Sequence, residues 1–286
     1  MPKSIRIHVL VDDWSGYNTR GALAEHGLSI LVEARYGDGS IARVLLDTGQ
    51  SGAPLINNAR ILGIDLSSID AVALSHCHYD HSGGLETLAR AVGRRVPLVL
   101  HPAALHPCYA LRPALTNIGM PIEQRRLSEL YELVKSEKPV EIAPGIYFLG
   151  HVPRYFEDLV PSIEGLYTAT SKGLEPYAAE DDSALAIDVE GLGGVVVTGC
   201  SHSGVANIVA RASEVLGSDV KAVVGGLHLV SSTRELIEAT ASKLRELGVE
   251  KLIVGHCTGF EAEKILSEVF KEGFSKMHSC LTISFP

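Results

Sequence analysis

Short apolar runs rich in β-branched residues alternate along the chain with helical patterns and glycine-rich turns. Period-two and continuous apolar runs predict strands at residues 5–11, 28–36, 41–46, 71–74, 97–100, 146–149, 183–189, 194–198, 220–224 and 251–254. Helical spacing predicts helices at 53–62, 85–92, 124–135, 205–216, 233–247 and 261–270. Hairpins early in the chain and helices between later strands indicate a layered α/β fold with mixed sheets.

Two stretches interrupt this pattern. Residues 101–145 begin with a proline-rich segment and continue into a charged helical pattern, which indicates an insertion on the scaffold. Residues 151–181 carry few regular signals, and a segment of this length inside a domain is often functional. We therefore expect one domain over residues 1–286, with an insertion at about 101–145 and an active-site loop at about 151–181.

Composition narrows the function classes. The 286 residues are 46% hydrophobic and carry a formal charge of −9, which disfavours a nucleic-acid or anionic membrane partner. No apolar run approaches the roughly 18–20 residues of a membrane span, and the first residues lack the apolar core of a signal peptide. Five cysteines without paired spacing indicate a reducing compartment, so we expect a cytoplasmic protein.

The densest chemical signal directly follows the strand predicted at 71–74. Four potential metal ligands, His76, His78, Asp80 and His81, fall within six residues. His76 and His78 point the same way if strand geometry continues, while Asp80 and His81 can reach a second point nearby. Imidazole and carboxylate suit Zn²⁺, Mn²⁺ or Fe²⁺, and the density of the cluster disfavours a polar turn with incidental histidines.

These four residues resemble the HxHxDH motif of the metallo-β-lactamase superfamily, and Asp47-Thr48-Gly49 resembles its DTG turn. The resemblance extends over nearly the whole chain. It implies a four-layer αββα sandwich with two mixed β-sheets. It also implies one or two divalent metal ions, with zinc favoured and manganese, iron or magnesium as alternatives.

The resemblance also implies two ligand sets. His151 lies in a segment similar to the family's GHTPG motif, and His256 follows a late strand where the final histidine belongs. Site one would then hold His76, His78 and His151, and site two Asp80, His81 and His256.

Cys200 departs from the family pattern, because it stands where the family has a metal-bridging aspartate. A thiolate can bridge or ligate, or the change could leave one metal weakly held. A small buried residue at a strand end is the plainer reading, and we favour a role at the metal. His202, two residues later, could be a ligand or a donor to an anionic substrate group.

Five further segments resemble one subgroup of the superfamily: residues 25–29, 181–185, 198–204, 225–229 and 256–259. That subgroup includes archaeal enzymes of methanopterin biosynthesis. They transfer a dihydropterin-methyl group from its pyrophosphate to 4-(β-D-ribofuranosyl)aminobenzene 5′-phosphate. The resemblance implies this activity, with a metallohydrolase of a phosphodiester, lactone or thioester as one alternative and a non-catalytic ligand-binding protein as another.

Roles for the remaining residues follow from these expectations. Asp80 and His228 are the candidate catalytic residues, although His228 could equally be a core histidine. A small anionic substrate, a pterin or a phosphate ester, is the expected partner. Its candidate contacts are His26, Arg154, Asp182 and His202, for which ordinary loop or turn positions are the alternative.

Overall fold

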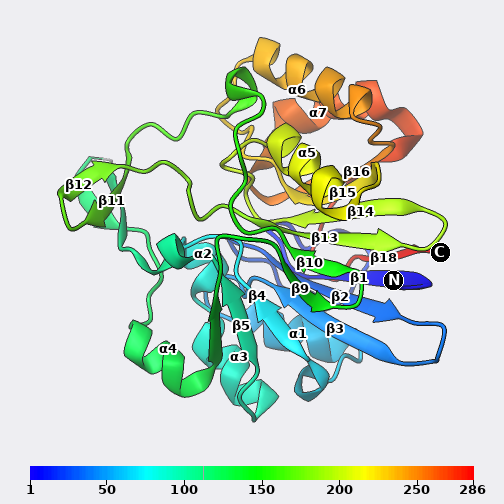
Figure 1. The fold of residues 1–286 in the computed structure, drawn as a ribbon, viewed down its shortest axis with the longest axis horizontal. Coiled ribbons are helices and arrows are strands. Elements are labelled where there is room, and N and C mark those ends of the chain that lie inside the picture. Colours follow the sequence, from blue (N-terminus) through cyan, green and yellow to red (C-terminus); the bar gives the residue numbers. More distant parts are fainter. Residues whose placement is uncertain (112) are drawn as a thin grey trace.

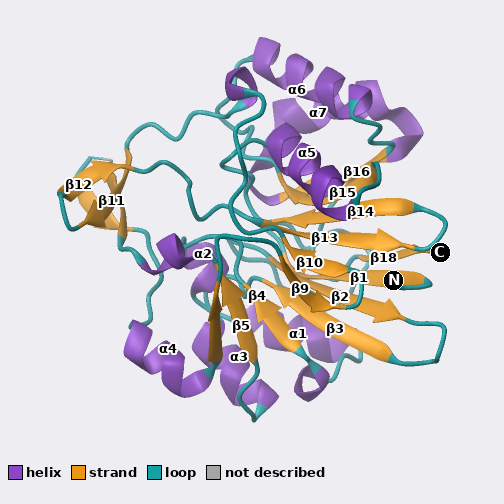
Figure 2. Cartoon of the chain, in the orientation of Figure 1, coloured by secondary structure: helices purple, strands orange, loops and turns teal. Residues whose placement is uncertain are grey.

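Two mixed β-sheets pack face to face between two layers of helices in the computed structural model, which describes residues 1–111 and 113–286 (Figure 1). The helices lie on the outer faces of both sheets, as the colouring by element in Figure 2 makes clear. The αββα sandwich expected from the sequence is therefore confirmed.

The first sheet has seven strands, in the order β18-β1-β2-β3-β4-β5-β8. Hairpins make its first part antiparallel, and β3, β4, β5 and β8 run parallel. Its strands are β1 (Ser4–Val11), β2 (Ser29–Arg35), β3 (Ile41–Leu46), β4 (Ala71–Ala73), β5 (Pro97–Leu100), β8 (Glu132–Lys135) and β18 (Thr282–Phe285).

The second sheet also has seven strands, in the order β17-β16-β15-β14-β13-β10-β9. Strands β14 to β17 run parallel and the rest antiparallel. Its strands are β9 (Val140–Ala143), β10 (Ile146–Phe148), β13 (Ala184–Val189), β14 (Gly193–Thr198), β15 (Val220–Gly226), β16 (Lys251–Gly255) and β17 (Phe274–Lys276).

Apolar side chains from both sheets fill the space between them, including Ile7, Val32, Phe148 and Val197, all fully buried. Two further clusters join each sheet to its helices. The α-helices are α1 (Ala53–Ile61), α2 (Tyr79–Ser82), α3 (Leu85–Val92), α4 (Gln124–Leu130), α5 (Val205–Leu216), α6 (Arg234–Glu246) and α7 (Phe260–Phe270). Short 3₁₀ helices are η1 (Leu66–Ser68), η2 (Pro102–Leu105), η3 (Glu157–Leu159), η4 (His256–Thr258) and η5 (Lys271–Gly273).

The helix predicted at 124–135 is wrong in its second half. Helix α4 ends at Leu130, and β8 then pairs in parallel with β5 at the edge of the first sheet. Tyr131 at the junction is fully buried, and its hydroxyl donates to the Leu85 carbonyl oxygen at 2.7 Å. This anchor, together with the free edge of β5, overrides the local helical pattern.

The two irregular stretches form one structure. Strands β6 (Cys108–Leu111) and β7 (Leu115–Asn117) pair with β11 (Leu166–Thr170) and β12 (Gly173–Pro176) in a four-stranded sheet. This four-stranded sheet protrudes from the sandwich in Figure 1. Its strands are short and largely exposed, so the sequence gives no clear apolar pattern for them.

No helix within the described parts of the chain is long and apolar enough to cross a membrane.

Substitution of Gly83 tests how closely the backbone packs beneath the HxHxDH segment. A Cβ atom at Gly83 would lie 1.9 Å from the Gln50 carbonyl oxygen, so Gly83→Ala must displace backbone. We expect a loss of about 1–3 kcal/mol in the free energy of unfolding, measured by urea denaturation. Gly37→Ala is the control, because its Cβ meets only the flexible end of Lys3. Equal stability of the two variants would contradict the packing argument.

Candidate metal centre

The candidate site lies where strands of both sheets end together. Asp47 follows β3, Cys200 follows β14, His228 follows β15 and His256 follows β16. The HxHxDH segment follows β4 and enters the short helix α2. Carboxyl ends of parallel strands meet at one edge of a sheet, and two such edges face each other here. The fold thus gathers residues separated by more than two hundred positions around one cavity of about 710 Å³.

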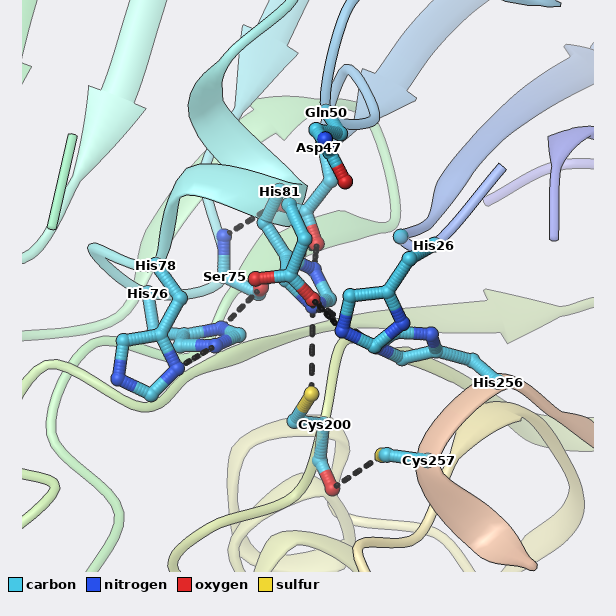
Figure 3. A network of polar contacts seen from close by, with 12 residues as sticks. His26, Asp47, Gln50, Ser75, His76, His78, His81, Cys200, His256 and Cys257 are labelled. Atoms are coloured by element: carbon cyan, nitrogen blue, oxygen red, sulfur yellow. Dashed lines mark hydrogen bonds and ion pairs between the residues drawn. The ribbon is translucent and has the colours of Figure 1, made fainter. Parts of the chain in front are cut away.

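Asp80, His81 and His256 converge on one point, as predicted for site two. One Asp80 carboxylate oxygen lies 3.4 Å from Nε2 of both His81 and His256, and these two nitrogens are 3.2 Å apart. The Cys200 sulfur lies 3.2 Å from His81 Nε2. In Figure 3, His81 and Cys200 stand between the His76–His78 pair and the His26–His256 pair.

His76 and His78 form the beginning of site one. His76 Nε2 lies 3.0 Å from His78 Nδ1. The third imidazole beside them belongs to His202, whose ring centroid is 4.8 Å from that of His76 and 4.9 Å from that of His78. Ligand atoms of His76, Cys200 and His202 lie within 4.8 Å of one another.

The structure does not bring His151 to this cluster. His151 is exposed, and its ring lies 6.4 Å from that of His101. Its backbone N–H donates to the Glu137 carbonyl oxygen, which holds the segment against the preceding loop. We therefore replace His151 by His202 in the candidate ligand set. The likeness to GHTPG therefore did not predict which way the His151 side chain points.

A buried carboxylate behind the histidines fixes their orientation. Asp47 accepts hydrogen bonds from the Ser75 N–H at 2.7 Å and the Ser75 hydroxyl at 2.6 Å. The other Asp47 contact is His81 Nδ1 at 2.7 Å. A protonated Nδ1 facing Asp47 leaves Nε2 free to face the cluster, the arrangement that orients imidazole ligands of metal ions.

Asp12 and Asp13 orient His256 in the same way. Asp13 Oδ1 lies 2.8 Å from His256 Nδ1, and Asp12 accepts the His256 backbone N–H at 2.9 Å. Burial raises the pKa of Asp12 to about 7. His256 itself has a positive φ of 39°, an uncommon conformation that these contacts help to hold.

Burial and charge divide the imidazoles into two sets. Burial lowers the pKa of His78 to about 4 and the pKa values of His76 and His202 well below the usual range. Burial opposes protonation of His81 too, but Asp80 and Asp47 outweigh it and raise the pKa of His81 to about 9. The pKa of His256 is also raised well above its usual value, where Cys257, Asp13 and Asp80 outweigh burial.

The residues present fit a divalent metal ion. His78 Nε2 and both ring nitrogens of His202 are buried without a hydrogen-bond partner. Unpartnered buried polar atoms are costly, and a cation would satisfy their lone pairs. Neutral imidazoles, an ionised Asp80 and a thiol are the ligand types that borderline-soft metals prefer.

The other predicted residues divide into those that line the cavity and those that do not. His26 and His228 line it beside Tyr79, and His26 Nε2 lies 3.6 Å from Asp80. Arg154 pairs instead with Glu157 and the Ala178 carbonyl oxygen, so it holds its own loop together.

Asp182 is fully buried behind the site, where it accepts the N–H and hydroxyl of Ser203 and thereby positions the His202 loop. Burial raises the pKa of Asp182 to about 7. Neither Arg154 nor Asp182 is placed to touch a ligand in the cavity, so we assign both to positioning.

Sequence reasoning missed Asp12, Asp13 and Cys257. Asp12 and Asp13 follow the first strand, as Asp47 follows the third, and that shared position was the signal available. Cys257 adjoins His256, but a single cysteine carries no signal of its own without the fold.

Replacing each of the two alternative histidines by alanine tests the ligand set. We expect His202→Ala to weaken zinc binding by more than the roughly 10- to 100-fold that loss of an outer hydrogen bond costs. His151→Ala, which removes an exposed ring, should leave the zinc Kd unchanged. Competition with a chromophoric chelator measures both. Weaker binding in His151→Ala alone would restore the original assignment.

Metal binding should release protons. At pH 7.5 both His81 and His256 are cationic in the metal-free protein, with a proton on each ring nitrogen, because their pKa values are raised. Binding of zinc to Nε2 displaces the proton on that nitrogen, so zinc affinity should increase with pH up to about 9. Calorimetric titration in buffers of different ionisation enthalpy counts the protons. We expect about two from His81 and His256 at pH 7.5, one more where the buried Cys200 thiol ionises to bind, and fewer above pH 9. Release that is absent or independent of pH would contradict the assignment.

Comparisons with known proteins agree with this geometry. Residues 24–256 match the family described as the metallo-beta-lactamase superfamily. A relative from Methanocaldococcus jannaschii, 7,8-dihydropterin-6-methyl-4-(beta-D-ribofuranosyl)-aminobenzene-5′-phosphate synthase, is 34% identical over 99% of this chain and 97% of its own.

Solved structures extend the comparison. A metal-dependent hydrolase of the beta-lactamase superfamily has a TM-score of 0.82 and 32% identity, covering 98% of both chains. The Zn²⁺-bound PqqB from Methylobacterium extorquens shares the fold alone, with a TM-score of 0.56, 15% identity and coverage of 97% and 99%. Because the family model matches most of the chain, the chain belongs to the metallo-β-lactamase superfamily of metal-dependent enzymes.

Proposed function

We propose that this enzyme transfers a dihydropterin-methyl group from its pyrophosphate to 4-(β-D-ribofuranosyl)aminobenzene 5′-phosphate. The observation that carries the proposal is the 34% identity to a synthase of that name over essentially the full length of both chains. The subgroup motifs at 198–204, 225–229 and 256–259 form the walls of the cavity, so the likeness includes the site itself. Five free cysteines suit a cytoplasmic enzyme.

Zinc is the metal we propose for the centre. His76, His78 and His202 would hold one ion, and Asp80, His81 and His256 the other, with Cys200 between them. Bound zinc would stabilise the negative charge that develops on a leaving pyrophosphate or on an attacked oxygen.

The cavity wall supports transfer over hydrolysis. Residues 162–166, which lead into β11, and Ile118, which follows β7, line the cavity together with the candidate ligands. Ile118, Ile163 and Leu166 present apolar side chains there, and an apolar wall excludes water from the reacting carbon. We propose that residues 151–181 act as the active-site loop through this contact.

Charge in the cavity indicates how an anionic substrate is held. Among its described lining residues there is no lysine or arginine, whereas Asp13, Asp80 and Glu164 are acidic. Phosphate groups would therefore depend on the metal centre and on the imidazoles for attraction. We propose that His26 and His228, which line the cavity, contact the substrate.

Within this scheme Asp80 and His228 are the proposed catalytic residues. The Asp80 carboxylate lies within 3.6 Å of nitrogens of three histidines, His26, His81 and His256. His81 and His256 outweigh its burial and hold the pKa of Asp80 well below its usual range, so it stays ionised. His228, with a partly exposed ring beside the cavity, would move a proton to or from the substrate.

A metallohydrolase acting on a phosphodiester, lactone or thioester is the second candidate. The structural relative at 32% identity is named a metal-dependent hydrolase, and the ligand types would serve either reaction. The choice between them depends on whether water or the ribosyl phosphate partner reaches the reacting centre.

A direct assay decides between the two reactions. Zinc-loaded protein is incubated with the pterin pyrophosphate, with and without the ribosyl phosphate partner, and with phosphodiester and lactone panels. We expect coupled product and little release of pyrophosphate without the partner. Turnover of the panels without coupled product would overturn the transferase.

A wall variant tests the reason. Ile163→Asn should admit water and raise the ratio of hydrolysis to coupling. Leu174→Asn, at an exposed position of the same 151–181 segment but outside the cavity, is the matched control and should leave the ratio unchanged. An unchanged ratio in Ile163→Asn would show that the wall does not exclude water.

A further inference from the structure

We propose that Cys200, Cys257 and His228 form an additional, thiolate-rich cation site beside the two ligand sets described above. The proposed occupant is a borderline-soft divalent cation, zinc in the cell. The inference concerns metal binding alone, so it stands or falls independently of pterin transfer. It adds a third position to a centre for which the family resemblance implies one or two ions.

The three side chains offer ligand atoms at suitable separations. One ligand atom each of Cys200, His228 and Cys257 lies within 4.8 Å of the other two. Zn–S bonds are about 2.3 Å and Zn–N bonds about 2.0 Å, so ligand atoms of one tetrahedral zinc ion lie about 3.5–3.8 Å apart. Small side-chain rotations therefore suffice to enclose an ion.

The backbone brings these residues together from three different loops. His228 follows β15 in a left-handed conformation with φ of 49°, and Cys257 lies in η4. Gly226 makes room for the sulfur, because a Cβ there would lie 2.8 Å from Cys257 Sγ. Figure 3 shows Cys200 and Cys257 side by side below the imidazoles.

Hydrogen bonding leaves a nitrogen of His228 open, and the Cys257 thiol makes only a weak contact, to the Cys200 carbonyl oxygen at 3.6 Å. His228 Nδ1 is buried and lacks a hydrogen-bond partner. The His228 backbone N–H donates to Cys257 Sγ at 3.2 Å, a contact that favours an electron-rich sulfur. A cation between these groups would satisfy the orphaned nitrogen and both sulfurs together. Nδ1 would bind the ion and Nε2 would carry the proton, so with the ion bound His228 would act toward the substrate as a hydrogen-bond donor.

Two thiolates make this position chemically different from the imidazole sites. Soft sulfur ligands select zinc or cadmium over magnesium, calcium and manganese. All three residues line the cavity, so a fourth coordination position would open toward the substrate. Cys200 also lies near the other ligand sets, and its sulfur would couple the new position to them.

Cobalt titration tests the proposal. Protein stripped with a chelator under reducing conditions is titrated with Co²⁺, while the thiolate-to-cobalt absorption and the bound equivalents are recorded. We expect Cys257→Ser to lose about one equivalent and a large part of the thiolate band. Cys280→Ser, a buried cysteine outside the cavity, is the matched control and should titrate like the wild type. A wild-type titration in Cys257→Ser would overturn the site.

A second variant separates metal binding from thiol chemistry. His228→Ala keeps both cysteines and should lose the same equivalent. The intact mass without reductant reports whether Cys200 and Cys257 instead join as a disulfide, with loss of two hydrogens to an added small-molecule disulfide. An unchanged equivalent count in His228→Ala, or a disulfide that persists in zinc-loaded protein, would overturn the proposal.

Discussion

The burial of many imidazoles at one shared sheet edge is the constraint on which the rest of the structure depends. Five imidazoles lie close together there, those of His76, His78, His81, His202 and His256. Nitrogens of neighbouring rings approach to 3.0–3.2 Å, and the His202 ring centroid lies 4.8–4.9 Å from those of His76 and His78. Such a cluster cannot be fully protonated, because like charges repel and burial penalises each one. Outer carboxylates on Asp47 and Asp13 stabilise charge on two rings, and the unpartnered nitrogens of the others call for a cation.

Both sheets are arranged to make this convergence possible. Each combines an antiparallel part with a parallel part, and the parallel strands of both end at the cavity. Ligands come from short loops held by close backbone contacts, such as Gly83 against Gln50 and Gly225 against Thr198. Positive φ angles at Asp47, His228 and His256 concentrate at the same edge, where strain is compensated by hydrogen bonds and packing.

The regular parts of the fold could be predicted from sequence because burial and period coincide there. The strand at 41–46 and the helices at 85–92 and 205–216 have the predicted bounds. The HxHxDH segment could also be singled out as a candidate metal site, since four donors in six residues need no long-range information.

Two features could not be predicted from the sequence. One is the place of His202, and not His151, beside His76 and His78; the other is the strand β8 where a helix end was expected. Both depend on which way a loop turns against distant chain, as with His151 N–H on Glu137. The sheet of β6, β7, β11 and β12 was missed because its strands are exposed and lack an apolar face.

The separate origin of the cavity's two sides has an evolutionary consequence. The candidate cation ligands lie in short loops and turns that directly follow strands of the sandwich, whereas residues 162–166 and Ile118 belong to segments added outside it. Mutation can therefore reshape the outer side, and with it the choice of reactant and the access of solvent, while the inner side keeps its ions. That independence gives a physical reason why relatives of similar identity carry the names of a synthase and a hydrolase.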